Sequence, residues 1–345
     1  TAGRMVLSAF ASFPGLRSWC ESGKPAEISL MTGANITLHS RNGQLSLTGY
    51  CQTEPMNMPV RPKTGKLSGD FRRSWRGVDY FGKFAWDFSG KSPGAILGAV
   101  FPLGVDWKLS SAVHSYSSSF GSDYTGGIRG WTKTSDEHGA TVGLEKAGAF
   151  LTADFAVKDR DRSKRQVRVL FRLPLQLTKV MVLSVRITER FRPYEEVLRY
   201  RTGARCDLDW SSSGLSARYG PSDKPAWKIR GRLEGLLCRS PAGLAYLEGG
   251  RKTDWFSAYL RGTIFIADNW DDRIYSYERD APGNFTVPAY YGRGWSLSAV
   301  SGCKLRLGRG RALKLYFRAS TMAYSFMKEP KPSVSEAKAQ AVVMF

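Results

Sequence analysis

Basic side chains recur at every second position on two segments of the chain, and their spacing points most directly to chemistry. We call them the basic stripe: Arg199, Arg201, Arg205, Lys228, Arg230 and Arg232. Successive residues of an extended strand point to opposite faces, so each set would lie on one face of its strand. Guanidinium and ammonium groups gathered on one surface favour anionic solutes or an acidic protein segment. The sequence therefore predicts an anion-binding or ligand-binding surface.

Carboxylates in the same region support a second interpretation of the basic stripe. Asp207 and Asp209 share the phase of Arg205, and Glu234 shares the phase of Arg232. Arginines paired with these groups would form a lattice that fills and stiffens the interior of the protein instead of conducting anions. Both interpretations stay open from the sequence.

Few residues offer nucleophilic or metal chemistry. The histidines are His39, His114 and His138, and the five cysteines are odd in number and lack CxxC spacing. A hydrolase would need a serine and a histidine in contact, with a third polar group orienting the histidine. His114 beside Ser111 or Ser115 is the candidate, whereas His138 falls in a predicted turn. We predict no enzyme, no catalytic residues, no metal site and no cofactor.

Alternating strands must carry these side chains, and residues 28–51 show the pattern most clearly. Apolar or small residues such as Ile36 and Leu38 alternate with polar ones such as Thr37 and His39. Asn42-Gly43 predicts a two-residue type I′ turn. A strand of about a dozen residues is longer than the usual five or six and suits a tilted crossing of a bilayer. One apolar face and one polar face are typical of a transmembrane hairpin.

The same alternation continues through residues 80–88, 181–190 and 198–210, with longer connections predicted over 52–72 and 279–293. No apolar run approaches the roughly 18 residues of a membrane helix. Only helices or closed barrels can cross a bilayer, because every backbone polar group must be paired internally. We therefore predict an all-β fold: a transmembrane, antiparallel outer-membrane β-barrel of about 16–20 strands, with short periplasmic turns and longer extracellular loops. Residues 1–345 would form this single domain.

The two ends of the chain add separate expectations. Thr1-Ala2-Gly3-Arg4 is not a signal peptide, and alternation already begins at Met5, so we expect the barrel to be the C-terminal part of a longer chain. Residues 336–345 alternate and end on Phe345. A final strand that ends on an aromatic residue resembles the closing strand that barrel-assembly machinery recognises, and Phe345 is the predicted closing-strand signal.

The charge balance bears on partners. The chain has 51 Lys and Arg against 30 Asp and Glu, a net charge of +21. In a soluble protein this would indicate a nucleic acid or an anionic lipid. In a barrel the polar lumen accommodates charge, and basic strand ends face phosphates. We predict contacts with outer-membrane lipid and lipopolysaccharide, and protein partners in an envelope complex; no motif supports nucleic acid.

Two regions resemble a known family. The first spans 75–116 and contains Val78-Asp79-Tyr80 and His114-Ser115-Tyr116; the second spans 272–280 and is followed by Gly292-Arg293-Gly294. With the tail 336–345, they resemble the β-barrel portion of Bacteroidota outer-membrane proteins that carry helix-hairpin-helix repeats ahead of the barrel. The resemblance covers most of the chain and implies the fold and a bacterial outer-membrane location. No helix-hairpin-helix segment occurs here, so the DNA-related role of those repeats does not carry over.

Three functions follow as hypotheses. The first is an outer-membrane channel or transport component, or a structural subunit of an envelope secretion or assembly complex. The second is a DNA-binding or DNA-uptake envelope protein with a basic lumen or surface. The third is a soluble, secreted β-rich binding protein, whose apolar faces would pair in a sandwich.

Overall fold

The computed structural model describes residues 4–12, 30–53, 62–121, 128–131, 134–216, 220–221, 226–308, 311–325 and 332–344 of the 345-residue chain. Within these ranges the chain is almost entirely extended, and the one helix is a short 3₁₀ turn, η1 (Trp270–Asp272). No helix in the described part of the chain has the length and apolar character to cross a membrane. The chain divides into two compact units, which are described separately.

Unit 1 comprises Thr1–Lys146 and Thr152–Arg168. Each of its strands pairs antiparallel with the next one along the chain. These strands are β1 (Arg4–Ser12), β2 (Met31–Ser40), β3 (Gly43–Thr53), β4 (Pro62–Trp75), β5 (Val78–Asp87), β6 (Ser92–Leu103), β7 (Trp107–Tyr116) and β8 (Glu137–Lys146). The strands β9 (Ala149–Val157) and β10 (Arg165–Thr178) each have one part in unit 1 and one part in unit 2.

Unit 2 comprises Ala147–Leu151 and Val169–Phe345. Its long strands are β11 (Met181–Phe191), β12 (Tyr200–Ser211), β15 (Ala226–Leu237), β16 (Pro241–Lys252), β17 (Phe256–Ala267), β20 (Gly292–Gly308), β21 (Arg311–Ala323) and β22 (Val334–Met344). They too pair antiparallel in this order. Two small hairpins stand apart: β13 (Leu215–Ser216) with β14 (Gly220–Pro221), and β18 (Ile274–Tyr275) with β19 (Ala289–Tyr290).

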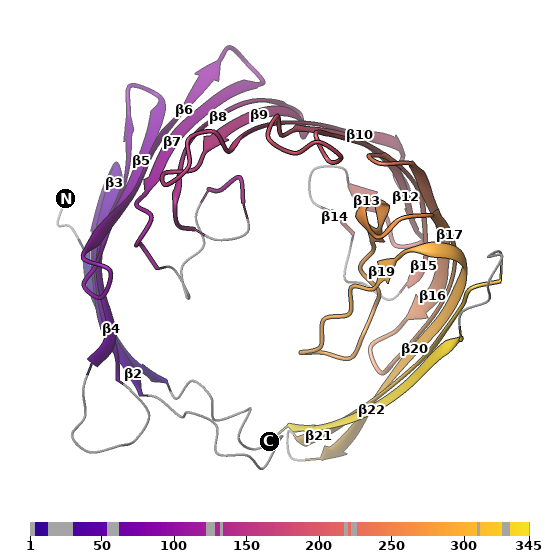
Figure 1. Cartoon of the computed structure of the whole chain (residues 1–345). Coiled ribbons are helices and arrows are strands. Elements are labelled where there is room, and N and C mark those ends of the chain that lie inside the picture. The colour runs from indigo at the N-terminus through magenta and orange to yellow at the C-terminus, as the bar shows by residue number, and fades with distance from the viewer. Residues whose placement is uncertain are drawn as a thin grey trace. The chain divides into compact units, whose positions relative to one another are not determined.

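Eighteen of these strands are assigned to one antiparallel sheet (Figure 1). Sequence-adjacent antiparallel strands place alternate connections at the same edge of a sheet. In unit 1, short turns follow β2, β4 and β6, whereas the connection after β7 is long; in unit 2 the longest described connection follows β17. The prediction of an all-β, antiparallel fold with about 16–20 strands is confirmed within the described residues.

The predicted turn at Asn42-Gly43 is wrong by one residue. Ser40 pairs with Gly43, so Arg41 and Asn42 form the turn and Gly43 begins β3. A glycine is required at position 43 because the backbone of β4 approaches closely: a Cβ there would lie 2.3 Å from the carbonyl oxygen of Arg72. The long connection predicted over 52–72 is also wrong for residues 62–72, which belong to β4.

Long strands of both units have an exposed apolar face, as Leu247 and Ile264 of unit 2 illustrate with 63% and 60% exposure. Residues of the opposite phase on the same two strands are buried, with Glu248 at 4% and Arg261 at 3%. We call these the apolar face and the polar face. In a soluble protein the apolar side chains are buried and the charged ones are exposed, whereas here the reverse holds. This arrangement matches a surface that faces lipid. It disfavours the sandwich hypothesis, in which the apolar faces would be buried against each other.

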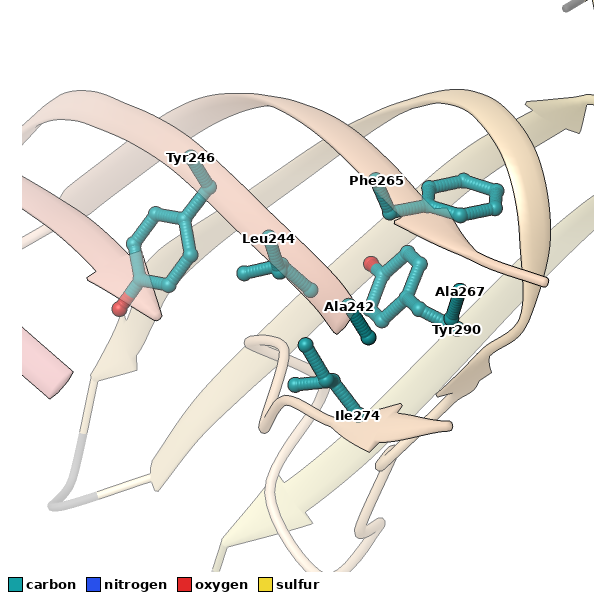
Figure 2. Close-up of a cluster of buried hydrophobic side chains, with 7 residues drawn as sticks. All are labelled: Ala242, Leu244, Tyr246, Phe265, Ala267, Ile274 and Tyr290. Atoms are coloured by element: carbon teal, nitrogen blue, oxygen red, sulfur yellow. The ribbon is translucent and has the colours of Figure 1, made fainter. Parts of the chain in front are cut away.

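In unit 2 the polar face is covered in part by residues 268–291, which we call the inner segment. This segment joins β17 to β20, contains η1, β18 and β19, and lies on the concave side of the neighbouring strands of unit 2 (Figure 1). Figure 2 shows the buried cluster at this contact: Ala242, Leu244, Tyr246, Phe265, Ala267, Ile274 and Tyr290. The hydrophobic core of unit 2 therefore sits between strands β16 and β17 and the inner segment.

Candidate functional site

Strand register places the basic stripe among carboxylates. Asp209 pairs with Arg230, Arg230 with Glu248, and Glu248 with Arg261, so charges of alternating sign cross β12, β15, β16 and β17 in one row. Opposite charges directly across a strand pair stabilise the pairing. In the adjacent row, Asp207 pairs with Arg232.

Short ion pairs join these side chains, two between β12 and β15 and one along β12. Arg205 Nε lies 2.5 Å from Asp207 Oδ2, Arg232 Nε lies 2.7 Å from Asp207 Oδ1, and Arg230 Nε lies 2.6 Å from Asp209 Oδ1. One carboxylate, that of Asp207, therefore serves two arginines. The Arg–carboxylate lattice that the sequence offered as one interpretation is present in unit 2.

The remaining members of the stripe lie apart from this lattice. Arg201 donates to the backbone carbonyls of Asp271 (2.8 Å) and Arg273 (3.1 Å), so it holds the inner segment. Arg199 is exposed just before β12 begins, and Lys228 lies near the start of β15, opposite Ser211. The stripe is thus not one continuous site: three of its members belong to the lattice, and the other three lie apart from it. The predicted closing-strand signal, Phe345, lies outside the described residues.

Two further arginines hold the inner segment from the polar face. Arg261 donates from Nη1 to the carbonyl of Tyr277 and from Nη2 to Ser276 Oγ, both at 2.6 Å, while its guanidinium lies 3.5 Å from the ring centre of Tyr246. Arg318 contacts Glu278 at 2.6 Å. Sequence analysis missed Arg261 as a site residue. Its signal is the single charged residue of β17, which lies at the inward phase of that strand.

The start of the inner segment is fixed by a buried carboxylate. Asp272 accepts hydrogen bonds from the backbone N–H groups of Arg239 (2.8 Å) and Ser240 (3.1 Å), and from Ser240 Oγ (2.6 Å). These donors lie in the β15–β16 turn. The inner segment is therefore tied both to the strands and to a turn between them.

Beside the lattice lies a pocket of about 420 Å³, which we call the arginine pocket. Its charged lining comprises Arg172, Arg186, Arg205, Arg230, Arg232, Asp207 and Asp209. Phe150, Leu170 and Ser184 complete it. Five arginines against two aspartates leave three positive charges in excess, so the pocket can attract anions. Among the described residues, no group of three or more His, Cys, Asp or Glu side chains could hold a metal ion.

In unit 1 the histidines differ from the sequence-based expectation. His114 is buried and bonds Glu137 (Nε2 to Oε1, 2.8 Å) instead of a serine. His138 lies on β8 and not in a turn, because Asp136, with a positive φ of 56°, turns the chain just before the strand. There it faces Ser115 across the strand pair, with Oγ 2.9 Å from Nδ1.

A third residue extends this contact. His138 Nε2 lies 3.0 Å from Asp159 Oδ1, which produces a serine–histidine–aspartate order. The other oxygen of Asp159 accepts the N–H of Ser118 at 2.9 Å, and so the chain of contacts ties the β9–β10 connection to the one that follows β7. We assign these three residues a structural role, because their contacts join β7, β8 and the β9–β10 connection.

No protein-family model matches the chain, and no curated protein matches it. Among solved structures, Pseudomonas aeruginosa OccK11 (OpdR) has a TM-score of 0.45 and 9% identity, covering 99% of this chain and 95% of that one. For P. aeruginosa OccK5 (OpdH) the TM-score is 0.42 at 8% identity, with coverage of 99% and 97%. The siderophore receptor PirA from Acinetobacter baumannii gives 0.47 at 8% identity, with coverage of 99% and 73%.

Proposed function

We propose that the protein is a channel of the bacterial outer membrane, through which small anionic solutes cross along the polar face. One observation carries the proposal: the same strands expose an apolar face and bury a face of alternating charges. An Arg or Lys that faces lipid at the bilayer midplane costs about 2–4 kcal/mol. The polar face must therefore face water, and in a membrane-spanning sheet that water fills a lumen.

The arginines determine which sign of solute charge this path prefers. Asp207 and Asp209 are engaged by Arg205, Arg230 and Arg232, so the surplus in the arginine pocket is positive. Rings of basic side chains select anions in pores. The inner segment narrows the path beside it, because it covers the polar face of β16 and β17.

Single-channel conductance in a planar bilayer tests this proposal, using reversal potentials in a salt gradient. We expect wild-type protein to prefer anions and Arg230→Glu to reduce or reverse that preference. The matched control is Arg251→Glu. Arg251 lies on β16 in the phase of the apolar face, with its guanidinium 5.4 Å from the ring centre of Trp227, and should leave selectivity unchanged.

Protein that inserts as a folded barrel but passes no current would contradict the channel. The tethered inner segment would then favour the second candidate, a structural subunit of an envelope secretion or assembly complex. A kinship with the Bacteroidota helix-hairpin-helix-containing family is also part of our proposal. The alternative of DNA binding or uptake stays a prediction based on the net charge of +21; it requires DNA affinity that falls steeply as salt rises.

A further inference from the structure

We propose that the arginine pocket of unit 2 binds a small organic anion, one that joins a carboxylate or phosphate group to a compact apolar body. Its place in a solute path rests on the channel function proposed above. The binding itself depends only on the pocket, which contains charge, an apolar wall and enough volume for such a molecule.

The first argument is the local excess of positive charge. Arg186 on β11 and Arg205 on β12 are directly opposite each other, and like charges in that position destabilise a strand pair. Asp207 is already shared by Arg205 and Arg232. Glu234, opposite Arg205, offsets one more charge and still leaves an excess of two. The lining of the pocket therefore keeps a net positive charge, which favours an anion.

The second argument is the direction from which the donors converge. Arg172 comes from β10, Arg186 from β11, Arg205 from β12, and Arg230 and Arg232 from β15. Neighbouring strands lie about 4.8 Å apart, so these four strands span about 14 Å. Guanidinium groups bind carboxylate and phosphate oxygens through two parallel N–H bonds. Arginines from several adjacent strands can therefore contact one anionic group.

The third argument is the apolar part of the lining. Phe150 and Leu170 are half-buried in the pocket, and the Arg172 guanidinium lies 6.0 Å from the centre of the Phe150 ring. The volume of about 420 Å³ falls within the range of small-molecule sites, which is roughly 300–1,000 Å³. A bare phosphate would leave this wall without contact, whereas a ring or a short alkyl group would cover it.

Isothermal titration calorimetry on the full chain, purified in detergent at low salt, tests the inference with three probes. Benzoate carries both features of the proposed ligand, inorganic phosphate has the charge alone, and benzyl alcohol has the ring alone. We expect saturable binding of benzoate, weaker binding of phosphate and none of benzyl alcohol. Each charge-assisted hydrogen bond contributes about tenfold or more to affinity. The double variant Arg172→Gln/Arg186→Gln should therefore weaken benzoate at least about tenfold.

Arg251→Gln on the apolar face is the matched control and should bind benzoate like wild type. The β-sheet circular dichroism signal of each variant checks folding. If the double variant fails to fold, Arg172→Lys preserves the charge but loses the forked donor, and should still weaken benzoate. Absence of saturable benzoate binding by wild type, equal affinity for phosphate and benzoate, or unchanged affinity in the folded variant would each overturn the inference.

The titration needs no ion current, so the two proposals fail separately. A protein that conducts ions but does not bind benzoate would support the channel function and overturn the proposed anion binding. A protein that binds benzoate saturably but passes no current in bilayers would support the proposed anion binding and overturn the channel function.

Discussion

Asp272 shows at the scale of a single residue how the inner segment is held. Burial alone would raise the pKa of this carboxyl. The hydrogen bonds from Ser240 and from the backbone N–H of Arg239 outweigh that effect and lower the pKa below its ordinary value of 3.8. A depressed folded-state pKa means that the ionised carboxylate stabilises the fold. That stabilisation is complete above the unfolded-state pKa and is lost as the pH falls through the lower folded-state value.

We expect Asp272→Asn to reduce the free energy of unfolding at neutral pH by about 1–3 kcal/mol, because the donors lose a charged acceptor. Below pH 3.8 the difference between wild type and variant should shrink, since the wild-type carboxyl itself becomes protonated. Chemical unfolding followed by circular dichroism, measured from pH 7 to pH 2.5, checks both points. Asp271→Asn is the control, since its backbone carbonyl still accepts from Arg201. A constant difference across the whole pH range would contradict the assignment.

At the scale of the element, the inner segment is a fixed part of unit 2. Asp272 ties its start, and Ser276 accepts from Arg261 at 2.6 Å and from Arg232 at 3.3 Å. Glu278 then accepts from both Arg318 and the Tyr290 hydroxyl. These anchors come from β15, β17 and β21, and so the segment braces strands that are not neighbours in sequence. It acts as an internal wall.

Glu278→Gln tests this bracing. The Arg318 and Glu278 side chains are each 3% exposed, and the variant leaves Arg318 with Glu336 as its carboxylate partner. Breaking a buried ion pair on one side costs about 3–5 kcal/mol. We expect a lower midpoint of denaturant unfolding and, because the segment loosens, a larger single-channel conductance.

Glu145→Gln on β8 serves as the control for that experiment, because Glu145 is exposed and faces Lys108 across the strand pair. Exposed pairs contribute about 0–1 kcal/mol, so this variant should unfold close to wild type. Equal stability of Glu278→Gln and Glu145→Gln would show that the inner segment does not brace the sheet.

At the scale of the whole molecule, the chain presents an apolar surface on its long strands in both units. In unit 1, Leu97 and Val113 are exposed while His114 and Tyr116 of the opposite phase are buried. In unit 2, Leu233, Leu247 and Ile264 are exposed in the same way. A soluble protein of this size would leave no such continuous set of large apolar side chains in water.

We expect Leu247→Arg to reduce the free energy of unfolding in lipid vesicles by about 2–4 kcal/mol, because it places a charge against lipid. Val105→Arg is the control: Val105 is 98% exposed in the turn after β6, where an arginine remains in water. Denaturant titrations in vesicles compare the two variants. A protein that dissolves without detergent and tolerates both substitutions equally would revive the sandwich hypothesis.

The sequence by itself determined the strands and their two faces. Alternation with a period of two is local, so Ile36 and Leu38 could be assigned to one face and Thr37 to the other without any knowledge of their neighbours. The face on which the basic residues lie could be assigned from the same alternation. Turn chemistry was less secure, as the one-residue error at Gly43 shows, because the backbone of β4 and not the turn itself requires that glycine.

Only the tertiary structure decided which side chains meet. Asp209, Arg230, Glu248 and Arg261 form one row because strand register aligns them, and backbone hydrogen bonds between strands are the same for every residue type. The same holds for His138 opposite Ser115. The inner segment returns to the polar face through contacts such as Arg318 with Glu278, which lie 40 residues apart. Local periodicity encodes the direction of a side chain, whereas its partner depends on long-range pairing that no short stretch of sequence contains.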